Sequence, residues 1–541
     1  MIPENLLREV ESWISDDPDP KTKAQLQEWI RQGAVKEISS CFQGFLEFGT
    51  AGLRGPLGPG PSRMNRSVVS KTAYGLARFM ANSGLKSIVI GRDARYGSED
   101  FTRDTAEIMS GAGFEVFVLP RALPTPVLAF AVRKLGCDVG VMVTASHNPP
   151  QDNGYKVYLG GTVNGIRYDG SQIISPTDSE ISKEIAAVPN LNLVKRGSDW
   201  TVLGDEIVNE YIATTARLGN SPLDLKVVYT AMHGVGTETL LKVFDRAGFA
   251  PPILVKEQAD PDPEFPTVAF PNPEEPGAID LSLKLAKEVD ADLVIANDPD
   301  ADRCAAAINE GGWRMLRGDE VGALLGEYIA RTSKDKKGAL ANSIVSSSIL
   351  KKIAKSYDLP FVETLTGFKY LAKVENLSFG YEEALGYSVD SKSVNDKDGI
   401  SAALALVQLA ADLKREGKTI ADLLNEIWRK YGFHGTRQIS VRTKSISDID
   451  KVMGKLRSEL PATLADFKIT KIDDLERPTD GLPPTNGVRI WLDDKYRVIV
   501  RPSGTEPKIK CYIEVVTTQQ SEATTILDSV EREFRTLMAV N

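Results

Sequence analysis

The chain of 541 residues contains only 4 cysteines, and their positions lack the paired spacing of a disulfide framework. Cys137 and Cys304 fall in apolar runs typical of strands, so both are expected to be buried thiols. The other two cysteines are Cys41 and Cys511. This usage fits a reducing compartment, and we expect a cytoplasmic location.

Long hydrophobic runs and an excess of positive charge are also lacking. The longest mostly apolar run, residues 400–411, is too short to span a membrane, and the acidic residues 1–20 lack the apolar centre of a signal peptide. The net charge of −9 argues against a nucleic-acid-binding surface. We therefore expect neither membrane nor nucleic acid as a partner, and anionic ligands must be attracted by local cationic loops.

What is present is the composition of an ordinary soluble protein, with 42% hydrophobic and 26% charged residues. A chain of this length exceeds one hydrophobic core, so several domains are expected. A strand–helix–strand pattern that predicts parallel α/β layers occurs three times. Its members are residues 86–90, 98–112 and 114–119; 225–230, 237–247 and 249–255; and 338–344, 347–357 and 359–364.

The hexapeptide TASHNP, residues 144–149, places a serine directly after an apolar run that predicts a buried strand. Residues 149–154 are rich in Pro, Asp, Asn and Gly and predict a turn, with Lys156 just beyond it. The Ser146 hydroxyl can act as a nucleophile or a phosphate carrier if a base and a counter-charge are near. The alternative is a serine-rich turn that caps a helix, and the hexapeptide alone favours it.

A second loop, NDPDADR at residues 297–303, also follows an apolar strand-like run. Alternate side chains of an extended segment face the same way, so Asp298, Asp300 and Asp302 can converge on one cation. Mg²⁺ fits, because few carboxylates plus a phosphate oxygen would fill its octahedron. Arg303 favours a phosphate in the same site. A solvated acidic turn is the alternative. The start of an EF-hand loop is another, but this sequence lacks the glycine at the sixth position and the glutamate at the twelfth position that such a loop needs.

A third loop, RPSGTEPK at residues 501–508, lies between two strand-like runs. Arginine, serine and threonine donors around a glycine form an anion-binding nest, whereas an ordinary hairpin would not need two hydroxyls and two cations. We therefore expect a bound phosphate here. The expected phosphate-binding residues of this loop are Arg501, Ser503, Gly504 and Thr505.

Together these loops resemble the α-D-phosphohexomutase superfamily, in the superfamily's own order and from about residue 45 onward. Residues 144–149 match its phosphoserine loop, 297–303 its metal loop and 501–508 its distal phosphate loop. GYEEALGY at residues 380–387, weak alone, matches the sugar-binding loop, and GTAGLRG at residues 49–55 matches the N-terminal signature. The residues of these loops look most like those of the phosphopentomutase-like branch, which also contains bacterial phosphoglucomutases.

The resemblance implies an α/β fold: three similar mixed α/β domains and a smaller C-terminal α+β domain around one central cleft. One loop from each domain would face that cleft. The expected parts are a helical extension (residues 1–40), domain I with the phosphoserine loop (41–195), domain II with the metal loop (196–312), domain III with the sugar-binding loop (313–431) and domain IV with the phosphate-binding loop (432–541).

The activity implied by the resemblance is that of a phosphosugar mutase, with Mg²⁺ as cofactor and a sugar bisphosphate as intermediate and activator. Phosphorylated Ser146, which also ligates the metal, would exchange phosphate with a sugar monophosphate. The base would be Lys156, if cations such as Arg54 lower its pKa, or His147. Adjacent residues of an extended strand point apart, so His147 is not expected to pair with Ser146 as in a hydrolase triad, and no G-x-S-x-G elbow is present.

Sugar binding is expected in the sugar-binding loop. Glu382 would hold sugar hydroxyls, Thr366 and Gly367 would line the cleft, and Lys397 would join the distal phosphate grip. Two departures from the superfamily, Ala384 and Tyr387, stand where Ser and His are frequent, so they bear on the sugar preference. In the metal loop, residues 298–300 read Asp-Pro-Asp where the superfamily frequently has Asp-Gly-Asp, and this difference leaves the aspartate ligands unchanged.

We expect glucose 1-phosphate to be converted to glucose 6-phosphate, with mannose or pentose phosphates (C5 in place of C6) as alternatives. A metal-dependent sugar phosphatase is the rival class, and it would not need a second phosphate grip. A silent sugar-phosphate sensor is the third reading, which intact Ser146 and the three aspartates oppose. The sequence predicts no oligomeric state.

Overall fold

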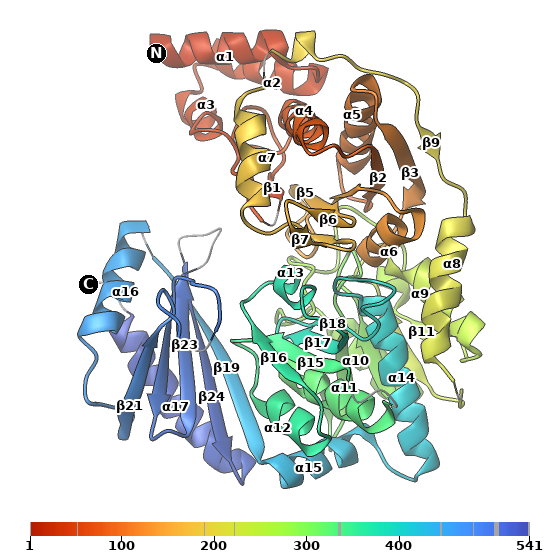
Figure 1. Ribbon diagram of the computed structural model, residues 1–541, viewed down its shortest axis with the longest axis vertical. Coiled ribbons are helices and arrows are strands. Elements are labelled where there is room, and N and C mark those ends of the chain that lie inside the picture. The colour runs from red at the N-terminus through yellow and green to blue at the C-terminus, as the bar shows by residue number, and fades with distance from the viewer. Residues whose placement is uncertain are drawn as a thin grey trace. The chain divides into compact units, whose positions relative to one another are not determined.

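The protein is described by a computed structural model over residues 2–50, 52–188, 190–220, 222–333, 337–443, 446–479, 481–502 and 508–538. The chain divides into two compact units, drawn in Figure 1 with elements labelled where there is room. The first unit comprises Met1–Leu316 and Leu385–Asp412, and the second comprises Arg317–Ala384 and Leu413–Asn541.

The first unit opens with three helices, α1 (Glu4–Asp16), α2 (Pro20–Gln32) and α3 (Val35–Cys41). Their apolar sides pack together around Val10, Leu26 and Ile38. The buried Asp17 carboxylate accepts hydrogen bonds from Thr22 Oγ1 at 2.6 Å and Ser67 Oγ at 2.8 Å, which ties the helices to the domain that follows.

The first large sheet has the strand order β1-β5-β4-β2-β3-β9, with β8 beside β5. Its centre, β3-β2-β4, is parallel, while β5 runs antiparallel to both β4 and β1. The strands are β1 (Leu53–Pro56), β2 (Ser87–Arg92), β3 (Glu115–Ala122), β4 (Val139–Val143), β5 (Asp152–Leu159), β8 (Ser171–Gln172) and β9 (Thr201–Val202), beside a small β6 (Thr162–Val163) and β7 (Ile166–Arg167) ribbon.

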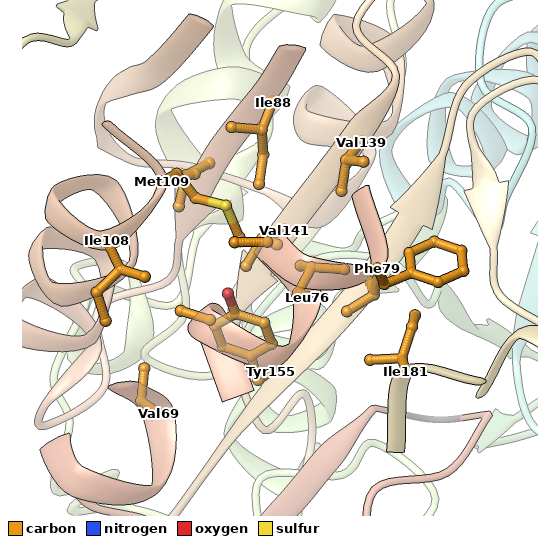
Figure 2. Packing of buried hydrophobic residues seen from close by; sticks show 14 of the residues in the cluster. Val69, Leu76, Phe79, Ile88, Ile108, Met109, Val139, Val141, Tyr155 and Ile181 are labelled. Atoms are coloured by element: carbon orange, nitrogen blue, oxygen red, sulfur yellow. The ribbon is translucent and has the colours of Figure 1, made fainter. Parts of the chain in front are cut away.

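Helices cover this sheet because each turns an apolar face toward it. Figure 2 shows Leu76 and Phe79 of α4, Met109 of α5 and Ile181 of α7 among side chains of the sheet, such as Val141 of β4. The helices are α4 (Arg66–Asn82), α5 (Ser98–Gly111), α6 (Thr125–Leu135) and α7 (Thr177–Ala186).

The second sheet of this unit has the order β11-β10-β12-β13-β14, parallel from β11 to β12 and antiparallel beyond. Leu385–Asp412 also belongs to this unit. The elements are α8 (Glu206–Thr215), β10 (Val227–Thr230), α9 (Gly236–Ala247), β11 (Ile253–Leu254), α10 (Asp280–Val289), β12 (Leu293–Ala296), β13 (Ala305–Asn309), β14 (Trp313–Met315), β18 (Gly386–Ser388) and α14 (Gly399–Arg415), which runs past Asp412.

The second unit contains a parallel arrangement β16-β15-β17 and an antiparallel sheet of order β19-β24-β23-β22-β21-β20. The change from parallel to antiparallel strands agrees with the expected change of domain type. Its helices are α11 (Gly318–Thr332), α12 (Ile349–Ser356), α13 (Phe368–Leu371), α15 (Ile420–Tyr431), α16 (Ile446–Ser458) and α17 (Gln520–Leu537). Its strands are β15 (Ala339–Ser343), β16 (Phe361–Thr364), β17 (Leu377–Glu382), β19 (Phe433–Arg442), β20 (Thr463–Leu464), β21 (Phe467–Asp474), β22 (Val488–Leu492), β23 (Tyr496–Pro502) and β24 (Lys508–Thr517).

The turn predicted as far as residue 154 is wrong in its second half, because β5 already begins at Asp152. There the strand pairs with β1 on one side, and on the other side the Thr144 N–H donates a hydrogen bond to the Gly154 carbonyl. A Cβ at Gly154 would lie 2.5 Å from the carbonyl oxygen of Thr144 and 2.8 Å from that of Leu53. Glycine at this position therefore permits two backbones to approach closely, instead of a turn.

All 4 cysteines are buried and unpaired, as expected for Cys137 and Cys304. Burial raises the pKa of Cys137 to about 12 and also raises those of Cys304 and Cys511. In the part of the chain that the structure describes, no helix combines the length and the apolar character needed to cross a membrane.

Candidate active site

The serine loop, residues 144–149, follows β4 directly. Ser146 is 2% exposed and has a φ of 53°, a left-handed conformation that is rare outside glycine. The Thr144 hydroxyl accepts a hydrogen bond from the Ser146 backbone N–H at 2.9 Å, and the Asn148 N–H donates to the Ala145 carbonyl at 3.1 Å. These local bonds turn the chain sharply at the serine.

The aspartate loop, residues 297–303, follows β12 in the same way. The Asn297 amide closes it by accepting from the Tyr229 hydroxyl at 2.9 Å and donating to the Arg303 carbonyl at 2.6 Å. The carboxylates of Asp298, Asp300 and Asp302 are buried, and one oxygen of each lies within 4.8 Å of the others. The predicted convergence of the three aspartates is confirmed.

The two loops meet at the serine hydroxyl. Ser146 Oγ donates a hydrogen bond to Asp298 Oδ2 at 2.8 Å, although the residues lie 152 positions apart in the sequence. A phosphate on this oxygen would therefore adjoin the aspartate loop.

Two lysines neutralise the other carboxylates. Lys156 Nζ, on β5, donates to Asp300 Oδ2 at 2.8 Å and to Asp302 Oδ2 at 2.9 Å. Lys397 Nζ donates to Asp302 Oδ2 at 2.8 Å. Thr125, which begins α6, donates from its hydroxyl to Asp300 Oδ2 at 2.5 Å and from its backbone N–H to the Asp300 carbonyl at 2.9 Å.

The carboxylates differ in pKa because their partners differ. Burial and the neighbouring charges of Asp300 and Asp302 raise the pKa of Asp298 to about 8. Burial acts in the same direction on Asp300 and Asp302, but the lysine ammonium groups outweigh it and lower both pKa values. The loop thus carries two stable negative charges and a third that a cation would favour.

The residues present fit a divalent cation. Asp300 Oδ1 and Asp302 Oδ1 are buried and have no hydrogen-bond partner among the residues that the structure describes. A buried carboxylate oxygen without a partner is costly, and a cation between these oxygens would remove that cost. An all-oxygen donor set of this kind suits Mg²⁺.

The base candidates are placed differently from expectation. His147 Nδ1 lies 3.2 Å from Ser146 Oγ, so the argument that the two side chains point apart is wrong: Ser146 is left-handed, not extended. Burial, followed by the charges of Arg303 and Arg54, lowers the pKa of His147 well below its usual value.

The pKa of Lys156 does not move as the sequence suggested. Burial and the cations Lys397 and Arg54 act to lower it, but Asp300 and Asp302 prevail and the pKa is raised. Lys156 is therefore an ammonium ion while it contacts these carboxylates.

One arginine contacts the serine loop, and another ends the aspartate loop. Arg54, on β1, donates from Nη1 to Asn148 Oδ1 at 3.2 Å. Arg303 lies at the end of the aspartate loop, with its guanidinium 4.0 Å from Asp298 and 3.8 Å from Glu274. Its backbone N–H donates to Asp298 Oδ1 at 3.0 Å, which orients this carboxylate toward the serine.

The remaining predicted residues lie in the second unit. Glu382 Oε1, at the end of β17, accepts a hydrogen bond from the Gly367 N–H at 2.6 Å, so these two are brought together beside half-buried Thr366. Arg501 is half-buried near the end of β23. The predicted phosphate-binding residues Ser503, Gly504 and Thr505 lie outside the described residues.

Thr125 is a site residue that the sequence reasoning missed. Its signal would have been the Pro-Thr-Pro sequence at residues 124–126, where a helix begins directly after a loop. Nothing near it in the sequence, however, points to Asp300, which lies 175 positions away.

Four family models match successive parts of the chain. Their descriptions are phosphoglucomutase/phosphomannomutase, alpha/beta/alpha domain I (residues 46–191), domain II (residues 207–312) and domain III (residues 317–431), and the C-terminal domain (residues 442–532).

Curated relatives that are similar to this chain differ in name, as three of them illustrate. A probable phosphomannomutase of Haemophilus influenzae is 48% identical, over 88% of this chain and 98% of that protein. A phosphopentomutase of Mus musculus is 36% identical, over 94% and 90%. A phosphoglucomutase of Staphylococcus epidermidis is 35% identical, over 93% and 96%. Among solved structures, a putative phosphomannomutase from Thermus thermophilus shares the fold with a TM-score of 0.70 at 23% identity, covering 91% of this chain and 98% of that chain.

Proposed function

Because this chain belongs to the phosphoglucomutase and phosphomannomutase family and is thus a phosphomutase, we propose that it interconverts hexose 1-phosphates and hexose 6-phosphates, with glucose 1-phosphate as the preferred substrate. The observation that carries this proposal is the contact of Ser146 Oγ with Asp298 Oδ2 at 2.8 Å within a buried set of carboxylates and lysines. A hydroxyl in this position is suited to hold a phosphoryl group between substrates.

In the proposed cycle, phosphorylated Ser146 transfers its phosphoryl group to the free hydroxyl of a sugar monophosphate. The bond from Ser146 Oγ to phosphorus breaks, a bond from phosphorus to the sugar oxygen forms, and the hydroxyl proton passes to a base. The resulting bisphosphate turns over in the site. Its other phosphoryl group then returns to Ser146 Oγ, the proton returns to the sugar oxygen left behind, and the isomer departs.

Two groups can take the proton. His147 Nδ1 is 3.2 Å from Ser146 Oγ and, with a lowered pKa, is a neutral imidazole that can accept a proton near pH 7. Lys156 Nζ contacts Asp300 and Asp302, so it can serve only after it releases a proton. Replacing each with glutamine and comparing the pH dependence of kcat distinguishes them, because loss of the base removes the limb of the profile that it creates.

Asp298, Asp300 and Asp302 are the residues that would hold Mg²⁺, which when bound neutralises charge on the transferring phosphoryl group. The chain's own cations act in the same region. Arg303 is the last residue of the aspartate loop, and Lys397 contacts the loop from a distant segment of the chain; both can hold phosphate oxygens near it.

Mannose 1-phosphate is the second candidate substrate, because the relative named a probable phosphomannomutase is 48% identical to this chain. Pentose phosphates are the third, supported by the relatives named phosphopentomutase. In the sugar-binding loop, Glu382 would accept hydrogen bonds from sugar hydroxyls, and a substrate that lacks a matching hydroxyl would leave a carboxylate unpaired.

The test is a turnover panel of glucose, mannose, ribose and deoxyribose 1-phosphates with Mg²⁺ and a trace of the corresponding bisphosphate. Isomer formation and inorganic phosphate release are measured together. We expect isomerisation of glucose 1-phosphate at the highest kcat/KM and little free phosphate. Stoichiometric phosphate release without isomer would instead identify a sugar phosphatase, and a higher kcat/KM for mannose or ribose 1-phosphate would replace glucose.

A further inference from the structure

Arg95 lies against the serine loop and donates hydrogen bonds to three of its backbone carbonyls and to one at the start of β5. Nη2 donates to the carbonyls of Ser146 and Asn148, each at 2.6 Å. Nη1 donates to those of Pro149 at 2.8 Å and Asp152 at 3.2 Å. One planar guanidinium thus joins both sides of the loop, from the serine to the first residue of β5.

The guanidinium is itself fixed from behind. Arg95 is 4% exposed, and its Nε lies 3.4 Å from Asp93 Oδ2. The other oxygen of Asp93 accepts from the Arg95 backbone N–H at 3.0 Å and from Ser98 Oγ at 2.8 Å. The Phe265 ring lies 4.9 Å from the guanidinium carbon, which adds a cation–π contact.

The loop needs such support because its conformation is unfavourable. Ser146 has a φ of 53°, and a non-glycine residue is strained in this region, so the conformation persists only if its surroundings enforce it. The contact from Arg95 Nη2 to the Ser146 carbonyl acts on the residue that carries this strain. Charge-assisted hydrogen bonds are about twice as strong as neutral ones, so several together can hold the conformation.

We propose that Arg95 is the positioning residue for Ser146: it holds the serine loop in the conformation that presents Oγ to Asp298. This inference rests on the proposed mutase function only for its effect on turnover. In the described contacts, the hydrogen bonds that Arg95 donates from Nη1 and Nη2 all go to backbone carbonyls, so it acts through the loop.

Lysine should not replace this arginine. The ammonium group of lysine is a point charge with three donors on a flexible stem, whereas the guanidinium presents five donors in one plane. Arg95→Lys keeps the charge but cannot serve Ser146 and Asp152 at once. Arg196→Ala is the control, because Arg196 is a part-buried arginine of the same unit that pairs with Asp104 and Glu107, both at 2.7 Å.

The first experiment measures kcat, KM and backbone hydrogen exchange of residues 144–153 for wild type, Arg95→Lys and Arg196→Ala. For Arg95→Lys we expect kcat to fall on the order of 100-fold with KM changed less than about fivefold, because a displacement of about 1 Å at the reacting group has this effect. Exchange in the loop should accelerate. Arg196→Ala should lower Tm yet leave kcat and loop exchange at wild-type values.

The second experiment uses chemical rescue. A cavity lined by Asp93, Arg95, His233, Asp262 and Phe265 adjoins the guanidinium, and removing the side chain would enlarge it. Millimolar guanidinium chloride should raise the kcat of Arg95→Ala at least tenfold, while an equal concentration of sodium chloride should not. If Arg95→Ala does not fold, Asp93→Asn, which leaves the guanidinium but removes its counter-charge, should show a smaller loss of kcat and faster loop exchange.

The outcomes separate this inference from the proposed function. If the wild type is active and Arg95→Lys keeps the wild-type kcat and the wild-type rate of loop exchange, the proposed role of Arg95 is overturned. An equal loss of kcat in Arg196→Ala does so too, because the effect would then be general destabilisation. If the wild type has no mutase activity, the proposed function is overturned. If loop exchange is then still faster in Arg95→Lys and unchanged in Arg196→Ala, the positioning role of Arg95 stands.

Discussion

The three carboxylates of the aspartate loop are not interchangeable, because each contacts different donors. Asp298 accepts from Ser146, Asp300 from Thr125 and Lys156, and Asp302 from Lys156 and Lys397. Removing one therefore changes more than the number of metal ligands. At Asp298 it frees the serine, and at Asp302 it leaves both lysines with fewer partners.

Ser146→Ala should abolish isomerisation, because it removes the oxygen that would carry the phosphoryl group. Folding should be little affected, since only the hydrogen bonds of this hydroxyl to Asp298 and His147 are lost. Turnover is followed as hexose 6-phosphate formation, and intact mass should show one phosphate on wild type and none on the variant. Wild-type turnover in Ser146→Ala would rule out a phosphoserine mechanism.

Asp300→Asn should lower kcat by several orders of magnitude and raise the Mg²⁺ concentration needed for half-maximal rate. One ligand and one charge are lost where the phosphoryl group transfers. The measurement is a Mg²⁺ titration of wild type and variant after treatment with a chelator. Glu274→Gln, which removes a carboxylate 3.8 Å from Arg303, is the control and should shift the titration little. A chelated wild type that keeps its full rate would show that the three aspartates hold no essential metal.

At the same scale, the sequence predicts which residues meet but not how they are turned. The alternation of carboxylates in residues 297–303 is enough to predict their convergence, because it depends only on local geometry. The contact of Ser146 with His147 could not be predicted, because it depends on the left-handed φ of Ser146. That conformation is enforced by groups distant in the sequence, Arg95 among them.

Among elements, β24 carries a buried ionic cluster that joins α12 to the antiparallel sheet of the second unit. Glu514 Oε2 lies 2.9 Å from Arg497 of β23, and Oε1 accepts from Ser347 Oγ at 2.7 Å. His434 of β19 places Nδ1 2.9 Å from the same oxygen. Burial opposes ionisation, but Arg497 and His434 prevail and hold the pKa of Glu514 well below its usual value.

Glu514→Gln should lower the free energy of unfolding by about 3 kcal/mol at pH 7, because it leaves Arg497 with a weaker partner in a buried site. A lowered pKa in the folded state stabilises the protein above the unfolded pKa near 4.5, and this contribution is lost as pH falls through and below that value. Urea unfolding at pH 7 and pH 4 should therefore show a loss between wild type and variant that shrinks at low pH.

The matched control for this experiment is Glu531→Gln, whose carboxylate pairs with Arg437 at 2.7 Å but is 23% exposed. Partly exposed pairs contribute less than about 1 kcal/mol, so its loss should be small. Equal losses in the two variants would show that the Glu514 cluster contributes nothing beyond an ordinary ion pair.

Arg501→Ala should raise KM at least tenfold for every hexose monophosphate and lower kcat as well. Arg501 lies near the end of β23, directly before the predicted phosphate-binding residues, and loss of the anchor misplaces the reacting hydroxyl. Initial rates across the sugar panel measure both constants. Lys495→Ala, which removes an exposed cation at the other end of β23, controls for net charge and should leave KM unchanged. An unchanged KM in Arg501→Ala would show that the loop is only a hairpin.

Elements were predictable from the sequence where their pattern is local. The strand before each site loop is an apolar run bounded by Pro, Asp or Asn, and both β4 and β12 lie where that pattern places them. The start of β5 was not predictable, because Asp152 and Gly154 carry turn signals. They become a strand through pairing with β1, about 100 residues earlier in the chain.

At the scale of the whole molecule, the path of the chain between the two units decides which residues reach the aspartate loop. Leu385–Asp412 belongs to the first unit, although the segments before and after it belong to the second. Buried tyrosines hold it there: Tyr158 donates to Asp396 at 2.8 Å and Tyr211 to Asp398 at 2.9 Å. This attachment brings Lys397 to the aspartate loop. The sequence did not predict this contact, because it indicated four separate domains that each contribute one loop.

Asp398→Asn should alter the pH dependence of the stability of the whole protein. Burial raises the pKa of Asp398 from 3.8 to about 6, against the hydrogen bonds it receives from Ser401 and Tyr211. The folded state thus holds a proton that the unfolded state releases, so stability falls as pH rises from about 4 to 6, by up to about 3 kcal/mol.

Urea unfolding at pH 4, 5, 6 and 7 checks this prediction. Asn keeps an acceptor for the backbone N–H groups of Ile400 and Ser401 and cannot titrate, so the slope between pH 4 and 6 should be shallower than in wild type. A parallel pair of curves would show that Asp398 does not contribute to it.

The burial of every native cysteine makes this protein convenient for site-directed labelling. With the thiol pKa of Cys137 at about 12 and those of Cys304 and Cys511 also raised, thiol-reactive dyes will find few thiolates in the native state. Leu193→Cys in the first unit and Ile472→Cys in the second would place new thiols at side chains that are 78% and 41% exposed. A donor and an acceptor dye on this pair would report by energy transfer whether the two units change separation when a sugar phosphate binds, without replacing any native cysteine.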